Sequence, residues 1–179
     1  MAKNLESNDI LLNEEEKEMV CGWILKAMKS EGKKVKMNLL YKATRDGDSH
    51  NSFHGKCNGK GYTLTLIKNT RGYRCGAFIT QSWQSSNNNI KDPNAFLFSL
   101  EYKEYYPSYD GTNAIYDHSS YLPTFGSTSD LYIASGCLNN NSSQSNFPYY
   151  YCGTRARGLT GGSYNFRVKE VEVYKIDIN

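Results

Sequence analysis

The feature that most constrains the fold of this chain is a set of short, Tyr-rich segments in which apolar and polar side chains alternate. Residues 62–67 (YTLTLI) form the first such segment, and residues 73–80 form a second one after the turn at 69–72. Alternation with a period of two is typical of a β-strand, and a loop of about four residues joins neighbouring antiparallel strands. The sequence therefore predicts a β-rich fold with a hairpin over residues 62–80.

Further strand-like segments follow along the chain. They lie at residues 95–100, 114–117, 130–135, 149–153 and 166–178. In the last and longest of these, the apolar positions change phase between Val168 and Val171, which predicts a β-bulge at Lys169 and Glu170. Beyond the bulge, apolar side chains point to both faces, so we expect this segment to form an interior strand of a sheet.

Two helices are predicted beside these strands. Asn13 can cap a helix over residues 13–31, and Glu16 stands where a capping box requires an acid. Ser49 can cap a shorter internal helix that carries His54. The expected fold class is therefore mainly β (α+β): a two-layer antiparallel β-sandwich with an N-terminal helix and a short internal helix.

The same patterns predict the domain organisation. Residues 1–12 are expected to form a flexible polar tail. Residues 13–179 are expected to form a single domain, in which the leading helix precedes a β-sandwich over residues 39–178. Two tracts, 84–91 (QSSNNNIK) and 139–146 (NNNSSQSN), carry almost no apolar side chains, so we expect both to be long mobile loops.

Composition excludes several functional classes. The net charge of +3 is too small to indicate nucleic-acid binding, and the mean hydropathy is −0.66. No apolar run approaches the roughly 20 residues that span a bilayer, and the N-terminus lacks the apolar region of a secretory signal. We therefore expect a cytoplasmic protein without a transmembrane segment. The five cysteines include no CxxC pair, which favours reduced thiols and argues against a structural zinc site.

Positive charge is concentrated after the first predicted helix. The lysines concerned are Lys26, Lys29, Lys33, Lys34 and Lys36. Four glutamates between residues 14 and 18 precede them, and this pattern is typical of a charged helix followed by a solvated loop. The alternative interpretation is a surface for an acidic partner or for a membrane.

A metal site is one possible use of the internal helix. His50, His54 and Cys57 lie at positions i, i+4 and i+7, on one face of that helix. No fourth ligand is evident, and Phe53 competes for the inward direction. We therefore expect a structural role, with Phe53 and Cys57 buried and His54 hydrogen-bonded nearby, and we expect neither a metal nor another cofactor.

Four side chains are candidates for catalysis: Asp46, His54, Glu170 and Glu172. Asp46 lies in an Arg-Asp-Gly turn, where functional residues are often exposed, yet pairing with Arg45 also explains it. Glu170 and Glu172 are two residues apart on a strand, so their carboxylates share a face, as the acid pair of a glycoside hydrolase would. No GxSxG nucleophile elbow, phosphate-binding loop or dinucleotide fingerprint is present.

Seven segments, taken in order, resemble the TLDc domain family of the eukaryotic oxidation-resistance proteins. They are LLYKATRDG at 39–47, FHGKC with KG at 53–61, GAF with SW at 76–83, DPNAFLFSL at 92–100, PTFG at 123–126, DLYI at 130–133 and VEVY at 171–174. Each motif is short, but their common order makes the resemblance specific. The family-motif positions are Arg45, Asp46, Gly47, Phe53, His54, Trp83, Gly126 and Asp130.

The resemblance implies a two-sheet β-sandwich with flanking helices. It also implies a role in protection against oxidative stress and binding to cytosolic subunits of the vacuolar-type proton ATPase, with no reaction firmly attached to the domain. The leading hypothesis is therefore a monomeric, non-enzymatic regulatory or interaction module. The alternative is a hydrolase-like or carbohydrate-active β-sandwich that uses Asp46, His54, Glu170 and Glu172.

Overall fold

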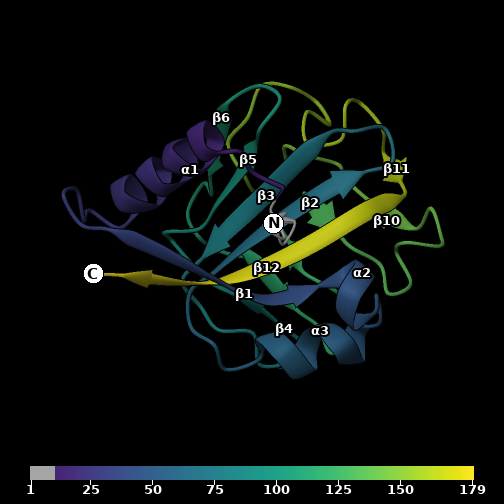
Figure 1. Cartoon of the computed structure of the whole chain (residues 1–179). Helices are drawn as coiled ribbons and strands as arrows, with labels where there is room; N and C mark the ends of the chain where they lie inside the picture. Colours follow the sequence, from purple (N-terminus) through teal and green to yellow (C-terminus); the bar gives the residue numbers. More distant parts are fainter. Residues whose placement is uncertain (1–10) are drawn as a thin grey trace, which may run out of the picture.

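The computed structural model describes residues 11–179, which form two antiparallel sheets (Figure 1). In spatial order, the first sheet contains β1 (Val35–Lys42), β12 (Val168–Ile178), β2 (Thr63–Asn69), β3 (Arg74–Ile79), β5 (Phe96–Ser99) and β6 (Glu104–Pro107). The second sheet contains β11 (Asn165–Phe166), β10 (Ser143–Gln144), β9 (Leu131–Tyr132), β8 (Thr124–Phe125), β7 (Ile115–Asp117) and β4 (Asn88–Ile90). The predicted β-sandwich is confirmed.

The helices are α1 (Glu14–Ala27), α2 (Ala43–Asp46) and α3 (His50–Cys57). Helix α1 covers the outer face of the first sheet (Figure 1), where Trp23 packs against Phe98 and Tyr105 with ring centroids 5.8 and 5.6 Å away. One apolar core therefore lies between the two sheets and a second one lies between the first sheet and α1. None of the helices in residues 11–179 is long and apolar enough to cross a membrane.

Strand β12 joins the two cores, as its sequence pattern predicts. Val171 and Val173 belong to the core between the sheets, whereas Tyr174 and Ile176 belong to the core beneath α1. The strand lies between β1 and β2, and its register against β2 shifts between Val168 and Glu170. The predicted bulge and the interior position of this strand are therefore both confirmed.

Helix α1 begins with the predicted capping box. The Asn13 side chain accepts from the Glu16 N–H, and the Glu16 carboxylate accepts from the Asn13 N–H. Residues 1–10 of the tail predicted over residues 1–12 lie outside the described residues. Its last two residues contact the first sheet: Leu12 is buried, and the Leu11 N–H donates to the carboxylate of Glu172.

The two polar tracts are more ordered than the sequence suggests. Residues 84–91 contain β4, and the N–H groups of residues 84–86 donate to the buried carboxylate of Asp117. Residues 139–146 contain β10, where the side chains of Ser143 and Ser145 are buried and hydrogen-bonded. Each tract therefore includes a short strand that the sequence did not predict, because buried polar groups from other segments provide the partners that apolar side chains do not.

The strand predicted over residues 149–153 is reduced to one bridge. Tyr151 pairs with Ser108, and on either side of it single hydrogen bonds connect this segment to the end of β6. The Tyr150 side chain is only half-buried, and that of Tyr149 is exposed. A segment at the edge of a sheet can therefore have the sequence pattern of a strand and yet not pair along its whole length.

Candidate functional site

The Arg-Asp-Gly turn closes the junction between β1 and α2. The Arg45 guanidinium donates to both carboxylate oxygens of Asp46, over 2.9 and 2.8 Å, and this pair lowers the pKa of Asp46. The same carboxylate accepts from the Lys42 N–H at 3.0 Å. Gly47 has a left-handed φ of +94°, and its carbonyl accepts from the Tyr41 hydroxyl. Asp46 therefore holds the chain as it leaves the sheet.

Glu170 and Glu172, the possible acid pair of a glycoside hydrolase, are both buried. The carboxylate of Glu170 accepts from the Thr44 N–H and hydroxyl and from the Val171 N–H. The Lys42 ammonium lies 4.0 Å from Glu170 and 3.6 Å from Glu172. These contacts attach the start of α2 to β12, because the bulge brings Glu170 over this helix.

Glu172 lies beneath the segment that leads into α1. One of its carboxylate oxygens accepts from the Leu11 N–H at 3.1 Å and from the Tyr174 hydroxyl at 2.9 Å. The other oxygen has no hydrogen-bond donor among the described residues, although Lys42 is its ion-pair partner. Burial raises the pKa of Glu172. This residue therefore binds the N-terminal segment to the sheet.

His54 connects α3 to the second sheet. Its Nδ1 lies 2.8 Å from the Asn58 side chain, and its Nε2 lies 3.0 Å from the carbonyl oxygens of both His118 and Tyr121. Its ring also packs against Phe53, with centroids 4.7 Å apart. Both ring nitrogens therefore have partners within the fold, and only 8% of the residue is exposed.

The three residues considered as metal ligands, His50, His54 and Cys57, do not converge. His50 contacts the Ser135 hydroxyl through Nδ1 at 3.2 Å, and Cys57 is fully buried in the core between the sheets. Among residues 11–179, no three His, Cys, Asp or Glu side chains are grouped so that they could hold a metal ion.

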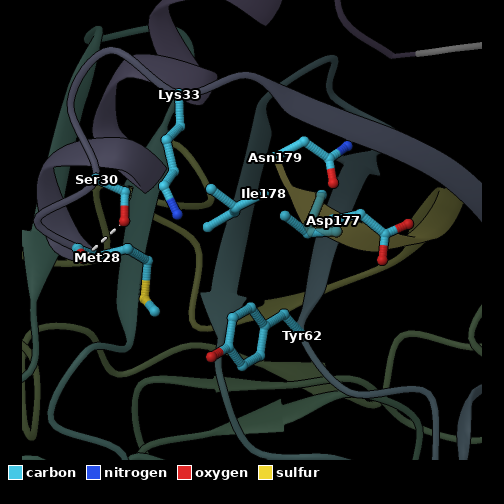
Figure 2. Close-up of a pocket in the computed structure, with 8 residues that line it drawn as sticks. Met28, Ser30, Lys33, Tyr62, Asp177, Ile178 and Asn179 are labelled. Atoms are coloured by element: carbon cyan, nitrogen blue, oxygen red, sulfur yellow. Dashed lines mark hydrogen bonds between the residues drawn. The ribbon is translucent and has the colours of Figure 1, made fainter.

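Each of the four catalytic candidates is engaged by neighbouring residues of the fold. Three of the surface depressions in the described chain have linings that include none of Asp46, His54, Glu170 and Glu172. Figure 2 shows the first depression, in which Met28, Ser30 and Lys33 of the α1–β1 connection face Tyr62 and the end of β12. The candidate groups thus lie against neighbouring residues of the fold.

The remaining motif residues contribute to the core and the turns. Phe53 packs edge-to-face against Trp83, with centroids 5.2 Å apart. Gly126 has a left-handed φ of +66° and lies directly against the Asp130 carboxylate, where a Cβ would collide with it. Asp130 accepts from the Tyr149 and Tyr150 N–H groups at 2.7 and 2.8 Å. Only glycine therefore fits beside this buried acid.

Two further acids, Asp92 and Asp117, are buried, although neither is among the candidate residues that the sequence suggests. Asp92 accepts from the Thr80 N–H and hydroxyl and from the Asn94 N–H, and Asp117 accepts from the N–H groups of residues 84–86. Both are fully or almost fully buried. Asp92 opens the motif DPNAFLFSL, whereas the only local signal of Asp117 is an acid at a strand end, which is common on protein surfaces. They hold connections between strands in place through backbone donors.

Burial raises the pKa of Asp130 to about 6, although backbone N–H donors favour its charged form. In the unfolded chain this pKa is about 3.9. Between these values the folded state binds more protons, so the contribution of Asp130 to stability falls as the pH rises. Between about pH 4 and pH 7, we expect the free energy of unfolding of the wild type to fall by up to about 3 kcal/mol relative to that of Asp130→Asn.

Urea unfolding of both proteins at several pH values in this range measures the difference directly. A stability difference that stays constant with pH would show that Asp130 keeps an ordinary pKa in the folded protein.

The cysteines have the properties of inert thiols. All five are free, and burial raises the pKa values of Cys75 and Cys137 to about 12. The pKa of Cys57 is also raised by burial. Because the thiolate is the reactive form, these three side chains are poor nucleophiles at neutral pH.

Comparison with known proteins shows which family these motifs define. The family model of the TLDc domain matches residues 5–177. The MTOR-associated protein MEAK7 of Danio rerio is 34% identical to the chain over 70 residues, which cover 39% of this chain and 16% of that relative. The similarity therefore spans about a sixth of the relative's length. Because the family model covers nearly the whole chain, this protein belongs to the TLDc domain family.

Proposed function

We propose that this protein is a non-catalytic regulatory module that binds cytosolic subunits of a vacuolar-type proton ATPase and thereby supports resistance to oxidative stress. A non-catalytic role is supported by the observation that the candidate groups form hydrogen bonds with other residues of the fold. Asp46 is paired with Arg45, Glu170 with Thr44, and His54 with main-chain carbonyls. Such a module acts through a surface that binds a partner, and not through a reactive cleft.

Membership of the TLDc family supports the proposed class of partner. The relative with a matching segment is described as an MTOR-associated protein. We propose that the chain works as a monomer in the cytoplasm, where the cytosolic sector of the ATPase is accessible.

A pull-down with the immobilised chain tests this proposal. We expect the chain to retain the cytosolic ATPase subunits from a lysate, detected by antibodies against each subunit. An unrelated β-sandwich of similar net charge is the negative control, and a TLDc protein that binds the ATPase is the positive control. If the positive control retains the subunits and this chain does not, the proposed function is wrong.

A further inference from the structure

The outer edge of β1 is the feature of the first sheet that has no partner strand. With eight residues, β1 is longer than an average strand, and it lies at the end of the strand order (Figure 1). At the opposite edge, the segment after β10 contacts the end of β6, where Tyr151 bridges Ser108 and the Cys152 N–H donates to the Pro107 carbonyl. Within the described chain, no segment makes such a main-chain contact with the outer edge of β1 from residue 35 to residue 39.

Hydrogen-bond geometry shows which main-chain groups of β1 point outward. Lys34 and Asn179 exchange both of their hydrogen bonds, so the alternation of an antiparallel pair directs the N–H and C=O groups of Val35, Met37 and Leu39 away from β12. No other described segment pairs with these groups. The next outward N–H, that of Lys42, is already bonded to Asp46. The open edge therefore extends from residue 35 to residue 39.

The charge around this edge favours an acidic occupant. Lys34 and Lys36 flank its first half, both are exposed, and neither has an ion-pair partner within residues 11–179. Leu39, at the other end, is 39% exposed, so this end of the edge is accessible to a partner. Lysines on an edge disfavour pairing of two copies, because the like-charged edges would face each other.

We propose that residues 35–39 bind an extended acidic segment of a partner protein, which adds to the first sheet as a further strand. Main-chain hydrogen bonds to Val35, Met37 and Leu39 would provide affinity, and Lys34 and Lys36 would select acidic side chains. This inference identifies a contact surface for the proposed function. It rests on that proposed function for the partner, which is taken to be a protein.

The probe for this test is a fluorescent peptide of about eight residues in which glutamate and valine alternate, compared with a peptide in which lysine replaces glutamate. Fluorescence anisotropy with the whole chain measures both affinities. We expect the acidic peptide to bind at least about tenfold more tightly than the basic one. Equal affinities, or preference for the basic peptide, would overturn the inference.

A proline substitution separates edge pairing from other contacts. Met37→Pro removes one outward N–H, and an edge strand accepts proline where its N–H faces solvent. Because Met37 also packs against the core beneath α1, Met37→Ala is the matched control for the lost side chain. We expect Met37→Pro to weaken binding of the acidic peptide by about tenfold and Met37→Ala to leave it nearly unchanged.

Two further measurements complete the test. Circular dichroism and urea unfolding verify that both Met37 variants fold, and Lys34→Glu with Lys36→Glu should reverse the charge preference if Met37→Pro cannot be purified. Sedimentation that showed a dimer lost in Met37→Pro would assign the edge to a second copy and refute the acidic partner.

The inference and the proposed function fail in different ways. If Met37→Pro retains the ATPase subunits as wild type does and the acidic peptide does not bind, the edge is not the contact surface. If the acidic peptide binds but the pull-down retains no ATPase subunit, the edge binds acidic strands and the proposed partner is wrong.

Discussion

Replacing Trp83 with alanine should lower the free energy of unfolding by about 4 kcal/mol. The indole is 1% exposed and packs edge-to-face against Phe53 at 5.2 Å and Phe125 at 5.9 Å. Its N–H donates to the Thr63 hydroxyl at 3.2 Å. These contacts join α3 to both sheets, so truncation leaves a cavity that no single element can close. Urea unfolding monitored by circular dichroism measures the loss.

The second tryptophan provides a matched control. Trp23 lies on α1, where it is only half-buried against Phe98 and Tyr105. Because water can replace part of its contacts, Trp23→Ala should cost about 1–2 kcal/mol. Losses of the same size in both variants would contradict a central role for Trp83. Trp83→Phe should recover much of the stability by refilling the cavity without the N–H.

Replacing Asp117 with alanine should lower the free energy of unfolding by about 3 kcal/mol and release the first polar tract. Its carboxylate is 1% exposed and accepts the N–H groups of Gln84, Ser85 and Ser86 over 2.8–3.2 Å. Without this acceptor, the segment that leads into β4 loses its anchor. Amide hydrogen exchange should therefore accelerate across residues 84–90.

Asp110 is a suitable control for Asp117. It is exposed and accepts a single N–H, from Thr112. Asp110→Ala should therefore change stability by less than about 1 kcal/mol and leave exchange in residues 84–90 unchanged. Unaltered protection of that tract in Asp117→Ala would show that β4 is held by its pairing with β7 alone.

These variants bear on the meaning of the family motifs. Trp83, Gly126 and Asp130 are internal positions, and Asp46 closes a junction of the backbone. A function shared by such a family does not require these residues at a surface. The proposed contact at β1 instead uses main-chain groups, whose availability depends on strand order and not on side-chain identity.

Local patterns in the sequence predicted several elements because their causes are local. The capping box of Asn13 and Glu16 depends on residues three apart, and the bulge before Val171 follows from a phase change within one strand. The hairpin over residues 62–80 depends on alternation and a short turn. Each of these signals is complete within a few residues of the chain.

The burial of Glu170 and Glu172 could not be predicted in this way. Their partners Lys42, Thr44 and Leu11 lie more than 120 positions away along the chain. The order in the polar tracts also has a distant origin, because the carboxylate of Asp117 belongs to another strand. An acidic residue considered without its tertiary partners is expected at the surface, because only those partners offset the free-energy cost of burying it.

The sequence by itself determined the fold class, the family and the two-faced character of the last strand, because periodicity and motif order are properties of the chain alone. Only the tertiary structure decided that the acids are internal and that β1 has an open edge. Strand order and buried hydrogen bonds join residues far apart in sequence, so no local pattern contains them.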